Sequence, residues 1–355
     1  MTTSRCIGIL GSGQLGRMLA IAAAQLGIDT HIYAPDAAAS PAASVASRST
    51  EAAYDDLAAL NDFVASVDVV TSEFENVPAE VMQQISTHCP ASPGEAALRI
   101  AQHRVAEKTL AARLGINTPR FWPVTSATRL DGALTELGGD GILKTCRLGY
   151  DGKGQRRVAS GDDASAIFDS FSSDDAILEE KIDFAFEISC LVARAPDGSI
   201  AHFPVSQNTH ENGILARTVA PATIPSSLAE KAQQATAALA DEVGLFGVLA
   251  VEFFVTRDDR LLFNEMAPRP HNSFHWTIEG CASSQFTQLA RVLAGLGFGD
   301  TSAYGRWQMD NVLGQHMQQV PDLLASNGVH LHLYGKPDAH TNRKMGHATR
   351  QLPES

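Results

Sequence analysis

Short apolar runs alternate with stretches of helical spacing along the first hundred residues. The apolar runs predict strands, and the stretches between them predict helices that lead from one strand to the next. This βαβ order predicts a parallel sheet. The predicted strands are Cys6–Leu10, Thr30–Ala34 and Asp68–Ser72, and the predicted helices are Gln14–Leu26 and Asp55–Val64.

The pattern changes twice after residue 100, which predicts two further units. A helix with Pro119 after its end marks the first boundary. The unit at residues 120–180 has the predicted strands GILKT and GQRRVAS, joined by the glycine-rich loop CRLGYDGKG. The predicted strands of the unit at residues 180–300 are FEISCLVARA, IAHFPV, GVLAVEFFV and RLLFNEM. The last fifty residues look irregular, with the short predicted strands VHLHLYG and GHATR.

Composition narrows the class of protein. Hydrophobic residues make up 44% and charged residues 19%, which is typical of a globular chain. The segment MTTSRC lacks the apolar stretch of a signal peptide, and no apolar run approaches the roughly 20 residues of a membrane span. We therefore expect a cytoplasmic protein without a membrane partner. A net charge of −13 argues against nucleic acid as a partner. The five scattered cysteines predict reduced thiols.

The first predicted strand runs into Gly11-x-Gly13-x-x-Gly16, and the second ends at Asp36. This spacing is typical of a dinucleotide-binding loop, in which the acid holds a ribose. A nicotinamide-dependent oxidoreductase is therefore one hypothesis. A glycine turn at a helix N-terminus binds other phosphate-like anions equally well, so the loop alone does not decide the ligand.

A pair of acids gives the most specific signal. If Asp258 and Asp259 are the two loop residues of a hairpin, Glu252 lies directly opposite Glu265, with Cβ atoms about 4.5–5.5 Å apart. Two such carboxylates repel each other, and a shared divalent cation such as Mg²⁺ offsets this electrostatic repulsion. Arg269 continues the same alternation, so its guanidinium could reach an anion beside the metal. The alternative is an ordinary hairpin with two acids facing solvent.

Eight motifs in the same order carry a family resemblance: GSGQLGRML, EFENVP, KT…GYDGKGQ, NGIL, NEMAPRPHNS, SQF, HLYGK and RKMGH. Together they resemble the N5-carboxyaminoimidazole ribonucleotide synthetases, biotin-independent carboxylases of purine biosynthesis in the ATP-grasp superfamily. Each motif alone is weak, but the order covers nearly the whole chain.

The resemblance implies a fold of mixed α/β and α+β class. It implies a Rossmann-like parallel-sheet domain at residues 1–100, a linker helix and ATP lid at 101–178, and a mixed-sheet catalytic domain with a small C-terminal subdomain at 179–355. It also implies ATP-dependent carboxylation of 5-aminoimidazole ribonucleotide with bicarbonate, through carboxyphosphate. ATP and Mg²⁺ are the implied cofactors, and a homodimer is the implied assembly.

The resemblance also assigns the site residues. The residues implied to bind ATP are Arg104, Lys144, Gly149, Tyr150, Asp151, Gly152, Lys153, Gly154, Gln155, Glu179, Glu180, Lys181, Ile182, Glu187, His210, Asn264 and Glu265. The residues implied to bind aminoimidazole ribonucleotide are Gln14, Leu15, Glu73, Asn76, Tyr150, Asp151, Lys336, Arg343 and Lys344. Arg269, His271 and Asn272 are implied to bind bicarbonate and carboxyphosphate, and Glu252 and Glu265 the metal.

Physical arguments support several of these roles, and each has an alternative. Glycines after Lys144 let backbone amides close over phosphates, although the loop is equally consistent with a mobile hairpin tip. Glu187 suits a ribose diol, unless it lies on an exposed strand edge. A guanidinium with amide and imidazole donors suits bicarbonate. His210 is equally consistent with a solvent-exposed loop position, and Glu75 with a position at the start of a helix. The C-terminal cations Lys336, Arg343 and Lys344 are equally consistent with a basic, solvent-exposed tail.

Three positions depart from the family pattern. His103 stands where the family usually has Asp, which removes the usual local partner of Arg104. Ser72 stands where an aromatic or apolar residue is common. Phe274 replaces an expected glycine, and its ring predicts a narrower site.

Three rival functions remain. The first is another ATP-grasp ligase, such as formate-dependent glycinamide ribonucleotide transformylase. The second is the nicotinamide-dependent oxidoreductase, and the third is a nucleotide-binding protein without catalytic activity.

Overall fold

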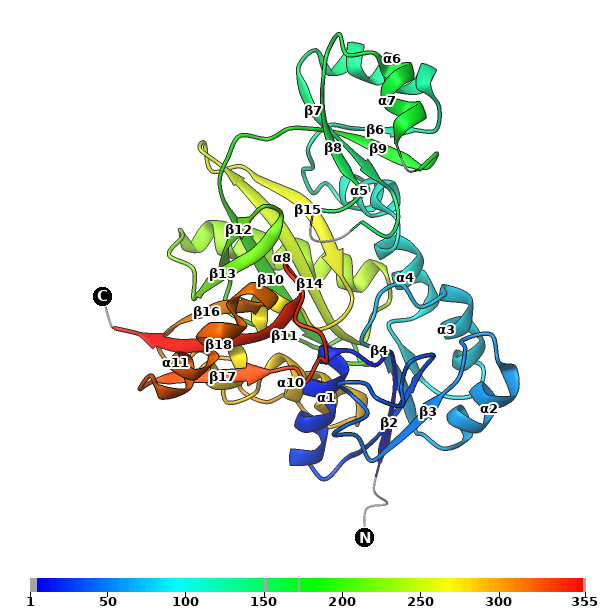
Figure 1. Ribbon diagram of the computed structural model, residues 1–355, viewed down its shortest axis with the longest axis vertical. Coiled ribbons are helices and arrows are strands. Elements are labelled where there is room, and N and C mark those ends of the chain that lie inside the picture. The colour runs from blue at the N-terminus through cyan, green and yellow to red at the C-terminus, as the bar shows by residue number, and fades with distance from the viewer. Residues whose placement is uncertain (1–4, 150–151, 172, 354–355) are drawn as a thin grey trace.

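The computed structural model describes residues 5–149, 152–171 and 173–353, which form three sheets with helices packed against them (Figure 1). The N-terminal sheet is parallel throughout, as predicted. Its strands, in sheet order, are β3 (Arg48–Glu51), β2 (Asp29–Ala34), β1 (Cys6–Leu10), β4 (Val69–Ser72) and β5 (Ala91–Ser92). Its helices are α1 (Gln14–Gln25), α2 (Leu57–Ala65), α3 (Ala79–Ser86) and α4 (Glu95–Ala101).

Strand β1 lies at the centre of this sheet, and all five of its residues are buried. A parallel strand with helices on both faces needs such a continuous apolar run. Helix α1 then packs against helix α10 (Gln285–Leu293), which lies on the largest sheet. Ile9 and Leu15 share one apolar core with Phe274 and Trp276, so the N-terminal unit and the largest sheet are packed as one body.

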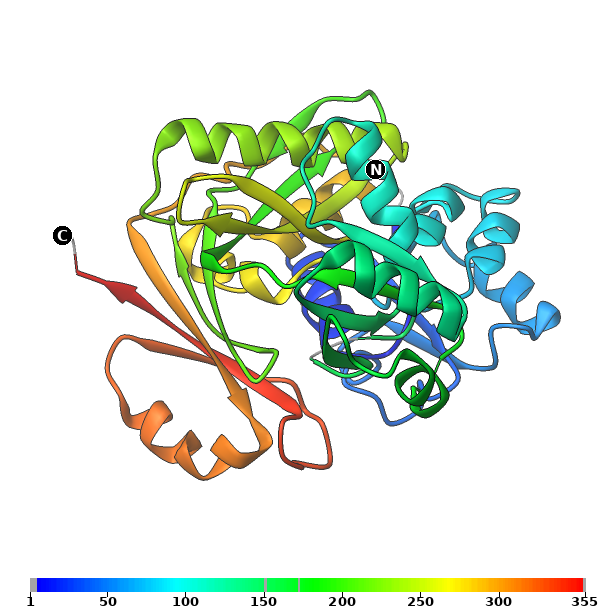
Figure 2. The ribbon, with the colours of Figure 1, turned by 90° about the horizontal axis from the view of Figure 1, so that it is seen from above.

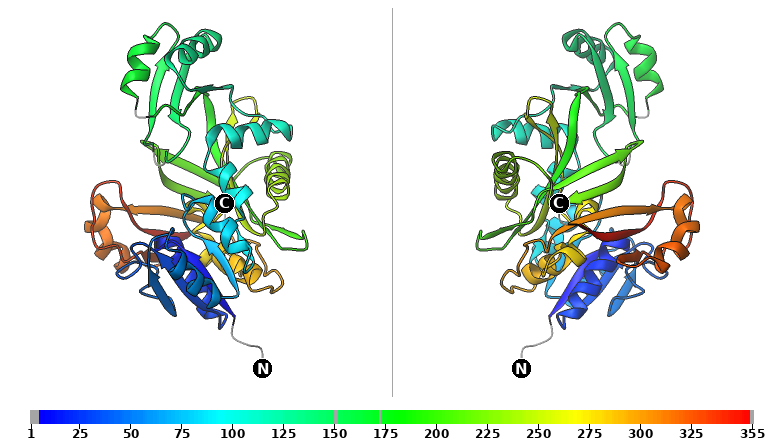
Figure 3. Two further views of the ribbon diagram at one scale, coloured as in Figure 1. Left: turned by 90° about the vertical axis from the view of Figure 1, so that its right-hand side faces the viewer. Right: turned by 90° about the vertical axis from the view of Figure 1, so that its left-hand side faces the viewer.

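The small unit is a four-stranded antiparallel sheet that projects from the rest of the molecule (Figure 3). Its strands, in sheet order, are β6 (Phe121–Val124), β9 (Ala176–Glu180), β7 (Asp140–Thr145) and β8 (Gln155–Ala159). Helices α6 (Ala127–Leu137) and α7 (Ala164–Ser170) supply its separate core with apolar side chains such as Leu130 and Ile167.

The largest sheet has nine strands. In order along the sheet they are β15 (Leu261–Ala267), β14 (Gly247–Thr256), β10 (Phe184–Arg194), β12 (Ser206–Glu211), β13 (Ile214–Ala220), β16 (Arg306–Leu313), β18 (Lys344–Leu352) and β17 (Val329–Leu333), and β11 (Ile200–His202) pairs with β10. Every pairing among the described strands of this largest sheet is antiparallel, which corrects the mixed sheet expected for this domain. The C-terminal strands extend this sheet, whereas the sequence pattern there looked irregular.

Helices cover the largest sheet. They are α5 (Arg104–Arg113), α8 (Ser226–Glu242), α9 (Thr277–Gly280), α10 (Gln285–Leu293) and α11 (Val320–Ala325), with the 3₁₀ turns η1 (Asn272–Phe274) and η2 (Gly314–Gln319). Helix α8 lies along β10 and β14, as Figure 2 shows. Helix α5 adds Leu110 and Ala111 to the core of this sheet, and it also contacts β6 of the small unit. Within the described ranges, no helix combines the length and apolarity that crossing a bilayer requires.

Candidate functional site

The hairpin β14–β15 pairs Glu252 with Glu265, as predicted. The structure has a longer turn and a bulge that were not predicted, and their effects on the register of the two strands cancel each other. The turn has three residues instead of two, since Thr256 N donates to Arg260 O at 3.0 Å and Asp259 adopts a positive φ of 58°. The register then shifts between Glu252 and Phe253, because Asn264 forms a bulge in β15. The bulge restores the alignment that the longer turn had changed.

The two carboxylates lie in different surroundings. Glu252 is buried, and burial together with the neighbouring Glu265 carboxylate raises the pKa of Glu252 to about 7. Burial would raise the pKa of Glu265, but Arg104, whose Nη1 lies 3.1 Å from Glu265 Oε2, lowers this pKa together with Lys144 and Lys108. A buried acid held next to another carboxylate fits a hard divalent cation with oxygen ligands. Both residues therefore fit the expected Mg²⁺ on the chemistry of their donor atoms.

A cluster of buried charges adjoins this pair where α5, β7 and β9 meet. Glu179 is 2% exposed, and its Oε2 lies 2.8 Å from Lys144 Nζ and 3.5 Å from Lys108 Nζ. Burial alone would raise its pKa, but the two ammonium groups lower the pKa of Glu179 to about 2. Its Oε1 is buried and has no partner among the described residues. The cluster thus brings together two of the predicted ATP-binding side chains, Lys144 and Glu179.

Glu187, expected at the ribose, and His210, expected among the ATP-binding residues, lie on neighbouring strands of the same sheet. His210 Nδ1 is 2.6 Å from Glu187 Oε2. Burial opposes a charge on the ring, but Glu187 and then Glu252 outweigh it and raise the pKa of His210. The histidine is therefore an ion-pair partner within the site and not the solvated loop residue of the alternative interpretation.

The glycine-rich loop lies between β7 and β8, over the turn that follows β12. A Cβ at Gly152 would lie 3.1 Å from Asn212 O, and Gly152 has a positive φ of 78°. Gly149 O accepts from Arg104 Nη2 at 3.4 Å. Tyr150 and Asp151, both predicted site residues, lie outside the described residues.

Other predicted ATP-binding residues occupy the loop and the segment after β9. Lys153 lies in the loop, and Gln155 begins β8, opposite Lys144. A Cβ at Gly154 would lie only 2.6 Å from Thr145 Oγ1, so this position requires glycine.

After β9, Glu180 pairs with Arg120 at 3.1 Å, and Lys181 lies 3.6 Å from Asp140. Ile182 is half-buried just before β10. The side chains of Glu180 and Lys181 thus form ion pairs apart from the Glu179 cluster.

The segment after β15 meets the N-terminal unit. Arg269 donates from Nε and Nη2 to Glu75 Oε2 at 3.0 and 2.6 Å. His271 Nε2 lies 3.7 Å from Glu252 Oε1, so this segment adjoins the carboxylate pair. Both amide atoms of Asn272 are buried and have no partner among the described residues. The three predicted anion-binding residues therefore belong to one segment that lies between Glu75 and the carboxylate pair.

The opening glycine loop binds a carboxylate of its own chain. Glu73 accepts from Gly13 N at 2.9 Å and from Gly16 N at 3.1 Å. A Cβ at Gly13 would lie 2.9 Å from Glu73 Oε1, so the glycine permits this approach. These amides hold the pyrophosphate in a dinucleotide site. Glu73 therefore stands where a nicotinamide cofactor would place its phosphates, and its side chain anchors the loop.

The remaining predicted substrate residues are spread over two units. Gln14 and Leu15 begin α1, and Asn76 follows the carboxyl end of β4. Lys344 begins β18, and its charge acts on both Glu252 and His271.

Lys336 Nζ donates to Lys344 O at 2.9 Å. Arg343 Nη1 donates to Asp338 O at 3.0 Å. The charge of Lys344 thus acts on one acid of the carboxylate pair, Glu252, and on His271 of the anion-binding segment.

Two departures from the family pattern have structural explanations. The Phe274 ring is fully buried and packs edge-to-face against Phe203, with 6.3 Å between centroids. The ring thus lies in the core and does not narrow the accessible site as expected. At the other departure, Arg104 finds Glu265 as its partner in place of the usual residue at position 103.

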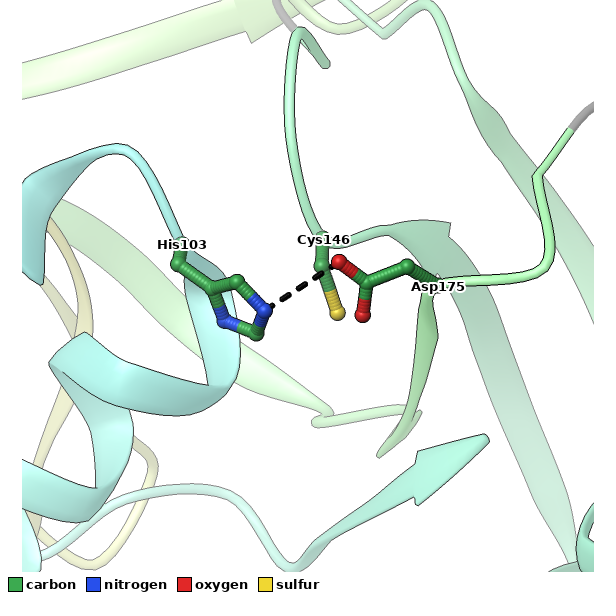
Figure 4. A group of neighbouring side chains, drawn as sticks. All are labelled: His103, Cys146 and Asp175. Carbon is green, nitrogen blue, oxygen red and sulfur yellow. Dashed lines mark ion pairs between the residues drawn. The ribbon is translucent and has the colours of Figure 1, made fainter. Parts of the chain in front are cut away.

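His103 belongs to a group with Cys146 and Asp175, whose ligand atoms lie within 4.8 Å of one another (Figure 4). Such a group resembles a metal site. However, His103 Nδ1 accepts from Ala106 N at 3.4 Å, which places the ring proton on Nε2, 3.2 Å from Asp175 Oδ2. A metal would need this nitrogen without its proton. We therefore interpret the group as a helix cap with a hydrogen-bonded partner.

Glu107 and Lys108 were not predicted as site residues. Both are buried on α5, and they contact the backbone on either side of Glu265. Lys108 stands in an ordinary helical pattern, so the sequence does not indicate that it contacts the backbone beside Glu265. The sequence around Glu75 is consistent with a helix entry, and it does not indicate the partner Arg269, which comes from a distant part of the chain.

Three family models match the chain. The ATP-grasp domain matches residues 109–286, the ribonucleotide synthetase preATP-grasp domain residues 4–102, and the phosphoribosylaminoimidazole carboxylase C-terminal domain residues 308–353.

The chain is 46% identical to an N5-carboxyaminoimidazole ribonucleotide synthase of Brucella melitensis, over 98% of this chain and 97% of that protein. It is similar to a solved N5-carboxyaminoimidazole ribonucleotide synthetase in complex with ADP, with 38% identity, a TM-score of 0.94, and coverage of 99% of this chain and 93% of that one.

It is also similar to an Aspergillus clavatus N5-carboxyaminoimidazole synthase in complex with ADP and 5-aminoimidazole ribonucleotide, with 28% identity, a TM-score of 0.92, and coverage of 99% and 95%. The expected ATP-grasp fold is confirmed. The chain belongs to the N5-carboxyaminoimidazole ribonucleotide synthase family of ATP-grasp enzymes.

Proposed function

We propose that the chain is an ATP-dependent carbon–nitrogen ligase that carboxylates 5-aminoimidazole ribonucleotide with bicarbonate in purine biosynthesis. An oxygen of bicarbonate takes the γ-phosphoryl group of ATP, which yields carboxyphosphate and ADP. The exocyclic amine of the ribonucleotide then captures the carboxyl group, either directly or as released CO₂. The bond between carboxyl carbon and phosphate oxygen breaks, phosphate leaves, and the amine loses a proton.

The observation that carries this proposal is the contact between the carboxylate pair and the anion-binding segment. Glu252 and Glu265 are paired across two strands, and His271 Nε2 lies 3.7 Å from Glu252 Oε1. A phosphorylated intermediate formed at the pair would therefore arise next to Arg269 and Asn272. Positioning and charge neutralisation supply most of the catalysis expected in phosphoryl transfer.

We assign the nucleotide to the cluster at the base of the small unit. Lys144 would exchange its contact with Glu179 for a phosphate oxygen, and the loop from Gly149 to Gln155 would close over the phosphates. The unpartnered Glu179 Oε1 would accept from the adenine amine. Glu187 would accept from the ribose hydroxyls, with His210 holding its carboxylate in place.

We assign Mg²⁺ to Glu252 and Glu265. When bound, this ion neutralises charge on the phosphates during transfer. Arg269, His271 and Asn272 would orient bicarbonate through a guanidinium, an imidazole and an amide.

The residues that would contact the aminoimidazole ribonucleotide are Gln14, Leu15, Glu73 and Asn76. Lys336, Arg343 and Lys344 would bind its 5′-phosphate. Tyr150 and Asp151 are assigned to this substrate on the family resemblance alone. The same resemblance supports a homodimer, a cytoplasmic location, and the division at residues 100 and 178 into parallel-sheet, lid and catalytic domains.

The test is phosphate production by the purified protein with Mg-ATP, aminoimidazole ribonucleotide and ¹⁸O-labelled bicarbonate. We expect ADP release to require bicarbonate, and one ¹⁸O atom to appear in the phosphate, because a bicarbonate oxygen remains bonded to phosphorus. Glu265→Ala should abolish ADP release, whereas Glu230→Ala, at an exposed acid on α8, should not. Full ADP production by Glu265→Ala contradicts the metal role, and activity with formate in place of bicarbonate contradicts the substrate assignment.

A further inference from the structure

Strand β15 is the edge strand of the nine-stranded sheet. Its outward-facing backbone groups have no neighbouring strand to pair with, and a buried group of this kind must find another partner. The same strand carries the Asn264 bulge and Glu265. The backbone at this point therefore needs support from outside the sheet.

Helix α5 supplies this support through two consecutive side chains. Lys108 Nζ donates to Asn264 O at 2.9 Å, and Met266 N donates to Glu107 Oε2 at 3.0 Å. The ammonium and the carboxylate thus replace the donor and the acceptor that an adjacent strand would offer. They hold the backbone on both sides of Glu265.

The burial of these two groups indicates a positioning role. Lys108 is 0% exposed and Glu107 is 2% exposed. Taking such charges out of water is costly, and apolar side chains often give equal or greater stability at such positions. Lys108 lies over the Phe263 ring, 5.7 Å from its centroid, so its surroundings would accept an apolar residue.

The same helix also contacts the Glu265 side chain. Arg104, one turn before Glu107, has its Nη1 3.1 Å from Glu265 Oε2 and 4.0 Å from Glu107 Oε1. Helix α5 therefore fixes both the backbone and the carboxylate of Glu265. A shift of the bulge would change where this carboxylate meets a cation.

We propose that Glu107 and Lys108 are positioning residues, which clamp the bulge of β15 so that Glu265 faces Glu252 in the geometry for metal binding. This inference rests on the proposed metal role of Glu265. Lys108 also faces Glu179, so it joins the metal-binding strand to the cluster assigned to adenine.

The decisive variants are at Glu107, which does not contact Glu179. Glu107→Gln keeps an oxygen acceptor for Met266 N, whereas Glu107→Met has a similar size and removes it. ADP affinity is measured by calorimetry with and without Mg²⁺. Hydrogen exchange of the Met266 amide is followed in the metal-free protein.

We expect Glu107→Met to weaken Mg²⁺-dependent ADP binding by about 10-fold to 100-fold, as is usual when the partner of a metal ligand is lost. ADP affinity without Mg²⁺ should stay at the wild-type value, and Met266 exchange should accelerate. Glu107→Gln should stay near wild type in all three measurements. Lys108→Met should weaken ADP binding with and without Mg²⁺, because it also removes the cation beside Glu179.

Unchanged Mg²⁺-dependent affinity in Glu107→Met overturns the inference, as does an equal loss in Glu107→Gln. If Glu107→Met does not fold, Glu107→Ser gives the same comparison, since its hydroxyl is too short to reach the amide. If wild-type protein binds ADP equally with and without Mg²⁺, the proposed metal role fails instead, so the two failures are distinguishable.

Discussion

Replacing Glu179 by Gln should destabilise the protein, although the substitution exchanges one carboxylate oxygen for an NH₂ group and nearly preserves the size and shape of the side chain. Glu179 is 2% exposed and lies between the ammonium groups of Lys108 and Lys144. Glu179→Gln removes the charge that these two cations share. Lys108 is fully buried and would then keep a charge with a weaker partner.

The pKa of Glu179 gives the expected magnitude. Burial would raise the pKa, but the ammonium groups lower it from its ordinary 4.5 to about 2. At 1.36 kcal/mol for each pKa unit, the carboxylate contributes about 3 kcal/mol to the free energy of unfolding. Because the folded pKa is the lower one, this contribution is complete above pH 4.5 and is lost as the pH falls toward 2.

The assay is urea denaturation at pH 7, followed by circular dichroism, with Glu180→Gln as the control. Glu180 follows Glu179 in the same strand, but it pairs with Arg120 at the surface. We expect a loss of about 3 kcal/mol for Glu179→Gln and under about 1 kcal/mol for Glu180→Gln, as for other surface ion pairs. Equal stability of Glu179→Gln and wild type would refute the charge-cluster argument.

Three further predictions concern other parts of the chain. Burial lowers the pKa of His31 from 6.5 to about 4. The free energy of unfolding should therefore fall by up to about 3 kcal/mol as the pH is lowered from 6.5 to 4. Denaturation of His31→Gln at these two pH values should lack this part of the pH dependence. Arg269→Lys removes a two-nitrogen contact and should lower kcat/KM for bicarbonate roughly tenfold to a hundredfold in the ADP assay. NADH fluorescence should show no saturable binding, because Glu73 occupies the loop amides; tight binding would contradict this.

The elements that the sequence pattern predicts well are the continuous or alternating apolar runs. Cys6–Leu10 was predicted with the observed bounds because a buried parallel strand has no polar interruption. Strand β3 has the sequence RSTE, is largely exposed and gives no such pattern. Strand β12 has the wholly polar sequence SQNTHE although two of its residues are buried, and β13 and β16 mix polar with apolar residues, so these three strands were not predicted either.

In the candidate site too, features that follow from a local sequence pattern were predicted, and contacts between distant elements were not. The opposition of Glu252 and Glu265 was predicted from hairpin alternation, yet it depends on a longer turn and a bulge that happen to compensate. Glu73 in the glycine loop and Glu107 beside Met266 could not be predicted, because those contacts depend on how distant elements pack. Local alternation is visible in a sequence, whereas a buried charge and its partner are not.

The central claim is that Glu252 and Glu265 jointly hold the divalent cation that accompanies the nucleotide. Its most direct test is the affinity of the ADP-bound protein for Mn²⁺, measured by electron paramagnetic resonance, in wild type, Glu252→Gln and Glu265→Gln. We predict that each substitution weakens Mn²⁺ binding at least about tenfold, since each removes one carboxylate ligand. Wild-type Mn²⁺ affinity in both variants would contradict the account.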